Sequence, residues 1–99
     1  MSSSRVVRVK DHLLALSIRA NCDKLFDYIE SLPEDHIIVD FSGFNTASRS
    51  FIHQYLLMKA NSSKKERIEE INLSPTIEGL FRIVKKQIEE PRIVSSSSS

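Results

Sequence analysis

The residue types best suited to chemistry in this sequence are a single cysteine and an aspartate that closes an apolar run. Cys22 follows Asn21, a predicted helix N-cap, and the free N–H groups of a helix start lower the pKa of a thiol and make it reactive. Cys22 also begins the apolar stripe of that helix, so burial as a small apolar side chain is the favoured interpretation. Asp40 ends a predicted strand at 36–41, where α/β proteins often place functional carboxylates, and it is equally suited to capping the loop that follows.

The histidines and glycines give little support to a metal site or a phosphate-binding loop. His12, His36 and His53 lie in three different predicted elements, and none has a second histidine four residues away, as a zinc site on a helix requires. One cysteine excludes an intramolecular disulfide and a cysteine-rich zinc site. Glycine-rich nucleotide motifs need more glycines than Gly43 and Gly79. We therefore expect no metal, no cofactor and no catalytic residue.

The segment 40–51 (DFSGFNTASRSF) is where the sequence favours a functional surface. A predicted buried strand runs into a polar loop, and Ser48 and Ser50 stand at the start of the next helix. Ser48 can cap that helix by accepting a hydrogen bond from a first-turn N–H, a contribution of about 1 kcal/mol. The alternative is a phosphate switch, because a helix start stabilises an added phosphate whose charge of roughly −1.5 to −2 repels an acidic partner. The frequency of serine at helix starts favours capping.

Apolar periodicity and helix-start residues place the elements that must position this segment. Strands are predicted at 5–10, 12–18, 36–41 and 67–73, and helices at 21–32, from Ser48 to the polar turn at 61–65, and from Ser74 to Pro91. The first two strands are expected to form a hairpin. The apolar run at 36–41 is expected to be a central strand covered on both faces.

The order β-β-α-β-α-β-α predicts one small α/β domain. Its sheet is expected to be four-stranded, mixed and mostly parallel, with three helices, and the hairpin is expected to supply an antiparallel edge. The length of 99 residues suits a single domain with a modest core. Residues 1–4 and 93–99 are rich in serine and are predicted to be disordered tails around a domain at 5–92.

Composition and charge argue against several classes of partner. The formal net charge is +1 at pH 7, which provides no long-range attraction for nucleic acid or an anionic membrane. The sequence has no apolar run of the roughly 18–20 residues that a membrane span needs, and its first residues lack the apolar core of a signal peptide. We therefore expect a cytoplasmic protein with no nucleic-acid and no membrane partner.

Two segments of the sequence resemble the STAS domain, which occurs in sulphate transporters and anti-sigma-factor antagonists. They are residues 37–51 (IIVDFSGFNTASRSF), followed by a predicted amphipathic helix, and residues 71–81 (INLSPTIEGLF). The likeness is greatest to the STAS-like group of uncharacterised prokaryotic proteins, in which an aspartate-aromatic-serine-glycine strand end precedes an alanine-serine-rich helix start. It covers about residues 14–90 and agrees with the predicted order of elements.

The resemblance implies a non-catalytic, regulatory module that binds another protein. In the antagonists, the loop and helix start after the central strand dock on a partner, often an anti-sigma factor with a GHKL-type ATPase fold. That partner phosphorylates a serine at the helix start, and the complex is released. The family's usual Asp-Ser-Ser-Gly run falls on Ser48, Arg49, Ser50 and Phe51, of which only Ser50 keeps its type. The implied partner-binding residues are Ser42, Gly43, Asn45, Thr46, Ser48, Arg49 and Ser50, with Ser50 and Ser48 as candidate phosphorylation sites.

Three other functions remain open at this stage. The first is a domain that binds a small ligand or nucleotide in the crevice beyond the carboxyl end of the strand at 37–41. The second is an enzyme that uses Asp40 or Cys22. The third is a structural subunit that pairs through the first strand, whose edge carries only Arg5, Arg8 and Lys10 as protection.

Overall fold

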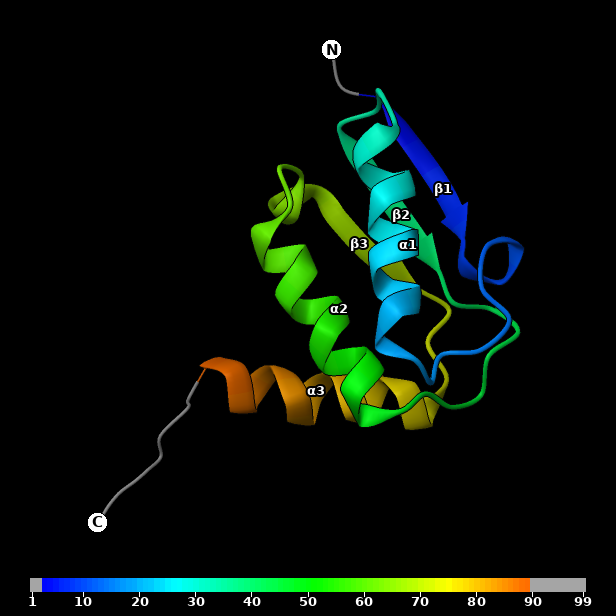
Figure 1. The fold of residues 1–99 in the computed structure, drawn as a ribbon, viewed down its shortest axis with the longest axis vertical. Helices are drawn as coiled ribbons and strands as arrows, with labels where there is room; N and C mark the ends of the chain where they lie inside the picture. Colours follow the sequence, from blue (N-terminus) through cyan, green and yellow to red (C-terminus); the bar gives the residue numbers. More distant parts are fainter. Residues whose placement is uncertain (1–2, 90–99) are drawn as a thin grey trace.

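The computed structural model describes residues 3–89, and most of the two predicted serine-rich tails lies outside them. Its elements are β1 (Ser4–Arg8), the 3-10 turn η1 (Val9–Asp11), α1 (Arg19–Ser31), β2 (His36–Asp40), α2 (Arg49–Asn61), the 3-10 turn η2 (Lys65–Arg67), β3 (Ile68–Ile71) and α3 (Pro75–Glu89). Over the described residues the protein is therefore a small α/β domain with three α-helices and a three-stranded sheet (Figure 1).

The sheet is parallel throughout, in the order β1-β2-β3. Val7 pairs with Val39, and Ile37 pairs with Ile68. The predicted antiparallel hairpin is wrong, and residues 12–18 form no strand. After β1 the chain turns into η1, where the N–H groups of His12 and Leu13 both bond to the Val9 carbonyl.

The segment that was expected to be the second strand is instead an irregular connection to α1. Leu13 and Leu16 are buried and Leu14 between them is 99% exposed, a spacing that does not match the alternation of a strand. Asp11-His12 also lacks the left-handed residues that a tight hairpin turn requires. The first strand therefore finds its partner across the α1 crossover, in β2.

Helices α1 and α2 lie on one face of the sheet, and α3 crosses the domain at the end where the strands finish (Figure 1). Crossovers between parallel strands are right-handed, so an order of β1-β2-β3 sends α1 and α2 to the same side. The prediction that β2 is covered on both faces is wrong for the part of the chain described. Ile37 and Val39 of β2 are fully buried, whereas Ile38, on the opposite face of β2, is only half-buried, and its neighbour Val6 in β1 is 52% exposed.

Helix starts follow the predicted rules in two cases out of three. Ser48 caps α2 through a hydrogen bond from the Phe51 N–H (3.1 Å), and Ser74 caps α3 through one from the Ile77 N–H (3.2 Å). Both predictions of an N-cap are confirmed. The remaining helix, α1, begins at Arg19, two residues before the predicted cap Asn21, and no side chain caps it.

Tyr55 of α2 is the centre of the core. Its ring is fully buried and meets Phe26 of α1, Phe41 after β2 and Phe81 of α3 edge-on, with centroids 5.3, 5.7 and 5.4 Å away. Its hydroxyl donates to the carboxylate of Glu70 in β3 (2.8 Å). One side chain of α2 thus joins α1, the end of β2, β3 and α3.

We predict that Tyr55→Phe keeps the fold and lowers the free energy of unfolding by roughly 1–2 kcal/mol, because it removes the buried hydroxyl that bonds to Glu70. Tyr55→Ala should cost roughly 3–5 kcal/mol, since it also leaves a cavity among three aromatic rings. Urea unfolding followed by circular dichroism measures both values. A Tyr55→Phe variant as stable as the parent would show that the hydrogen bond to Glu70 contributes nothing.

Candidate functional site

The candidate site is the loop between β2 and α2 together with the first turn of α2. Asp40 closes β2, and its carboxylate accepts hydrogen bonds from the Ser42 N–H (2.8 Å) and from the Asn72 side-chain amide (3.0 Å). The hydrogen bond from Asn72, followed by those from Ser42, holds the pKa of Asp40 below its usual range. The capping interpretation of Asp40 is therefore confirmed.

Two further contacts hold the loop in place. Ser74, at the start of α3, donates its hydroxyl to the Asn45 carbonyl (2.7 Å). Gly43 has a φ of +91°, a conformation that other L-residues rarely adopt, and its carbonyl accepts from the Lys10 ammonium (3.4 Å). The loop is thus tied to α3 on one side and to η1 on the other.

Ser48 and Ser50 have different environments although they are two residues apart. The Ser48 hydroxyl accepts from the Phe51 N–H and donates to the Ser17 carbonyl (3.2 Å), and the side chain is half-buried. Ser50 is exposed, and its Oγ lies 3.3 Å from that of Ser48. Of the two serines, Ser48 is the one whose hydroxyl bonds to the backbone, and Ser50 is the more exposed residue.

The structure brings the predicted partner-binding residues into one continuous surface at 42–50. Gly43, Asn45, Thr46, Arg49 and Ser50 are exposed, and Ser42 and Ser48 are half-buried. Sequence reasoning missed the residues that lie beside this surface on other helices. A cavity of about 370 Å³ next to Arg49 and Ser50 is also lined by Arg19, His53, Val84 and Gln87.

A sequence signal for this cavity did exist. Arg19 and Arg49 are the first residues of α1 and α2, and neither helix has an acidic residue in its first turn. The helix dipole disfavours a cation there, so an arginine at two helix starts is unusual. The signal was hidden because α1 was predicted to begin at Asn21, which placed Arg19 outside the helix.

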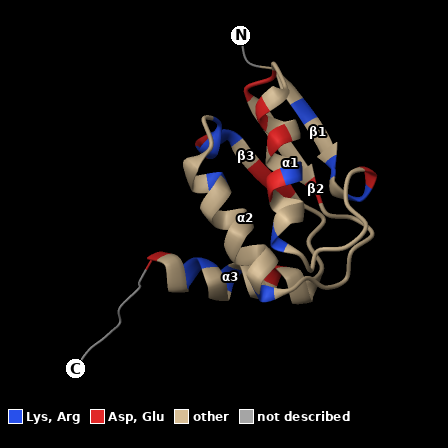
Figure 2. Ribbon diagram, in the orientation of Figure 1, with Lys and Arg blue, Asp and Glu red and all other residues tan. Residues whose placement is uncertain are grey.

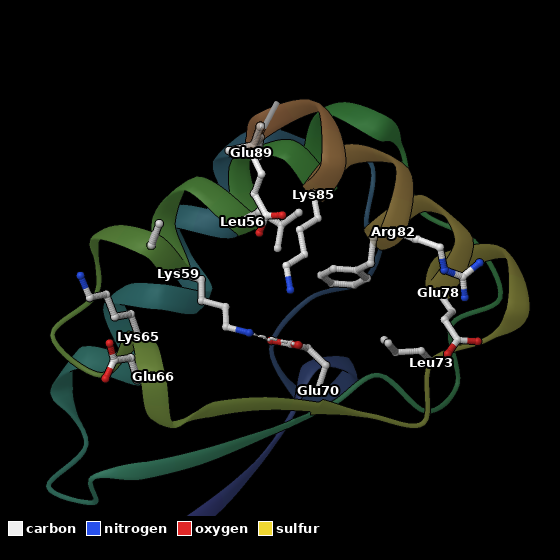
Figure 3. A pocket seen from close by; sticks show the side chains of 13 residues that line it. Leu56, Lys59, Lys65, Glu66, Glu70, Leu73, Glu78, Arg82, Lys85 and Glu89 are labelled. Atoms are coloured by element: carbon white, nitrogen blue, oxygen red, sulfur yellow. Dashed lines mark hydrogen bonds and ion pairs between the residues drawn. The ribbon is translucent and has the colours of Figure 1, made fainter. Parts of the chain in front are cut away.

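A second, larger cavity of about 630 Å³ lies between α2, β3 and α3 (Figure 3). Lys59 and Glu70 point toward one another inside it and form an ion pair at 2.9 Å. The charged residues around it balance, four basic against four acidic: Lys59, Lys65, Arg82 and Lys85 with Glu66, Glu70, Glu78 and Glu89. The sequence predicted a ligand crevice beyond the carboxyl end of the strand at 37–41. Neither cavity is lined by a residue of that strand, and the smaller one includes Arg49 and Ser50, at the end of the loop that follows it.

The residues considered for catalysis have structural roles. Cys22 is fully buried, and its thiol donates to the Phe51 carbonyl (3.3 Å), so its interpretation as a buried apolar side chain is confirmed. His36 pairs with Glu69 of β3, and the ring of His12 packs on that of Tyr28 at 4.3 Å. Among residues 3–89, no group of three or more histidine, cysteine or acidic side chains could hold a metal ion.

Comparison with known proteins identifies no family for this chain. No family model matches the chain, and neither a curated protein nor a solved structure matches it. Within the described part of the chain, none of the helices has the length and apolar character needed to cross a membrane. The function proposed below therefore rests on the geometry of this chain and on the resemblance in its sequence.

Because the Cys22 thiol and the Tyr55 phenol are buried, we predict that the protein loses stability at alkaline pH. Burial, with a smaller effect of the Asp23 charge, raises the pKa of Cys22 from 9.0 to about 12, and burial raises that of Tyr55 well above 10.0. The folded state favours both neutral forms, so this contribution is complete below pH 9 and is lost as the pH rises. Between pH 9 and 12 the loss from Cys22 alone rises toward a limit of about 1.4 kcal/mol per pH unit.

Urea unfolding of the parent and of Cys22→Ala at pH 8, 9 and 10 tests this assignment. The variant should start from a lower stability and lose less of it between pH 9 and 10, because its unfolded chain has no thiol to ionise. The same decline in both proteins would contradict the attribution to Cys22.

We predict that alanine at the two serines of the α2 start has unequal effects on stability. Ser48→Ala should lower the free energy of unfolding by about 1 kcal/mol, because the Phe51 N–H loses its acceptor. Ser50→Ala should change it by less than about 0.5 kcal/mol, as is usual for an exposed surface side chain. Chemical denaturation of the two variants side by side provides the measurement, and equal losses would show that Ser48 is not the cap.

Proposed function

We propose that this protein is a non-catalytic regulatory module that binds another protein through residues 42–50, in the manner of a STAS-type anti-sigma-factor antagonist. The observation that carries the proposal is the exposure of Arg49 and Ser50 at the first turn of α2, at the end of a loop that is fixed at several points. A loop held in one conformation before binding loses little entropy when a partner docks.

The STAS-like assignment is supported by how the two resembling segments meet. Residues 37–51 form β2, the loop and the start of α2, and residues 71–81 form the end of β3 and the start of α3. The hydrogen bond between Ser74 and Asn45 joins the two, and the bond between Asn72 and Asp40 joins them a second time. Segments that share a family likeness thus form one surface, which supports a shared function for them.

Charge supports an acidic group on the partner. Arg49 is exposed, and no carboxylate of residues 3–89 lies within ion-pair distance of it. A guanidinium fork matches the geometry of a carboxylate or a phosphate. Following the resemblance, we propose a GHKL-type ATPase or kinase as the partner.

The environments of the two serines favour Ser50 as the residue that the partner phosphorylates. The Ser48 hydroxyl is engaged with the backbone of Phe51 and Ser17, whereas Ser50 is an exposed residue whose hydroxyl contacts only that of Ser48 among residues 3–89. A phosphate on Ser50 would sit in the first turn of α2, where the helix dipole favours a negative charge. Its charge would reverse the sign of the surface beside Arg49 and release an acidic partner.

We predict that Arg49→Glu and Ser50→Asp each abolish binding of the protein that co-purifies with this chain from its own host. The melting temperature and far-ultraviolet circular dichroism should stay close to those of the parent, because both side chains are exposed. Incubation of the parent with the co-purified partner and ATP should add one phosphate, which peptide mass spectrometry should locate on Ser50.

Two variants control for charge and for helix position. Arg82→Glu reverses an exposed arginine on α3, and Thr76→Asp places an acid in the first turn of α3, as Ser50→Asp does in α2. Both controls should bind the partner as the parent does. Equal loss of binding in a control and its test variant, or unfolding of Arg49→Glu, would overturn the proposed surface.

A further inference from the structure

The cavity of about 370 Å³ beside the start of α2 is built by three helices that are distant in sequence. Its lining consists of Arg19 from α1, of Arg49, Ser50 and His53 from α2, and of Val84 and Gln87 from α3. The polar side chains are all hydrogen-bond donors or carry donor groups, and Val84 supplies a buried apolar wall. These side chains come together only when the three helices pack in the folded chain.

The charge of this cavity is not balanced. Its lining contains two arginines and a histidine and no acidic residue, whereas the larger cavity between α2 and α3 has four basic and four acidic side chains. Over residues 3–89, Arg19 and Arg49 form no ion pair and donate no side-chain hydrogen bond. Asp23, one turn beyond Arg19, accepts instead from the Gln54 amide at 3.5 Å.

The backbone adds to this positive charge. Both arginines occupy the first position of a helix, and neither first turn contains an acidic residue. No side chain caps α1, so its first N–H groups keep their positive partial charge without a side-chain acceptor. Figure 2 shows basic residues at the starts of α1 and α2, while the acidic residues of α1 lie further along the helix. A negatively charged ligand in this cavity would be attracted by both arginines and by the N–H groups at the start of α1.

We propose that this cavity binds a phosphoryl dianion, either inorganic phosphate or a small phosphomonoester. Two guanidinium groups can each donate a pair of hydrogen bonds to phosphate oxygens, and His53, Gln87 and Ser50 can complete the set of donors. The volume lies within the range of small-molecule sites, and the wall at Val84 suits the carbon group of an ester. The inference goes beyond the proposed function, because it requires no protein partner.

The test is a titration of the purified, partner-free chain with sodium phosphate and with phenyl phosphate, against sodium chloride at matched ionic strength. Nitrogen-15 NMR spectra should shift at the backbone amides of 19–21 and 49–53 and at the arginine side chains of the cavity. Equal affinity for the two ligands would assign the site to phosphate, and tighter binding of phenyl phosphate would assign it to an ester. The absence of any shift beyond that caused by chloride would overturn the proposal.

Three matched variants separate a built site from general charge attraction. Arg19→Gln and Arg49→Gln should each weaken phosphate binding by roughly tenfold or more, as expected for a charge-assisted hydrogen bond. Arg82→Gln, an exposed arginine that lines the balanced cavity, should leave it unchanged. An equal loss in Arg82→Gln would show unspecific attraction and overturn the site.

The same variants keep this inference distinct from the docking proposal. Arg19 lies outside the surface at 42–50, so Arg19→Gln should lose phosphate binding and still bind the partner. Failure of the phosphate titration would therefore leave the partner surface standing. Phosphate binding by the parent, together with partner binding that Arg49→Glu does not weaken, would support the phosphate site and overturn the docking surface.

Discussion

The structure depends on the hydrogen bond made by the buried hydroxyl of Tyr55. The ring is fully buried among aromatic side chains of α1, α3 and the end of β2, and an unsatisfied hydroxyl there would cost about 1–3 kcal/mol. Glu70 of β3 accepts its hydrogen bond, and Lys59, one turn further along α2, neutralises that carboxylate. This contact fixes the position of α2 on the sheet. The location of Arg49 and Ser50, one to two turns before Tyr55, follows from it.

A sheet with helices on one face explains where the candidate sites lie. In an all-parallel sheet whose crossovers have one hand, every helix begins at the carboxyl end of the strand before it. The starts of α1 and α2 therefore meet at one end of the domain, and α3 passes beneath them (Figure 1). That arrangement brings Arg19 and Arg49 to one cavity although they are far apart in sequence. On the opposite face, Val6 and Ile71 remain exposed.

The loop before α2 combines rigidity with exposure. Its backbone is held by hydrogen bonds to the side chains of Asp40, Lys10 and Ser74, so its exposed side chains have defined positions before any binding. Ser48 caps the helix, and the proposed site of phosphorylation is the exposed Ser50. A division of this kind allows a regulatory charge to be added without removing a hydrogen bond on which the fold depends. It also places the modifiable hydroxyl beside the cavity proposed to bind phosphate.

The sequence by itself determined the features that depend on near neighbours. The caps at Ser48 and Ser74, the buried stripe of α1 and the strand at 36–40 were predictable because each follows from side chains within a turn or two of the backbone they stabilise. Tertiary structure alone decided that β1 pairs with β2, that residues 3–89 leave one face of the sheet without a helix and that two arginines line one cavity. Strand pairing and side-chain convergence are set by competition among all segments of the chain, which no local pattern records.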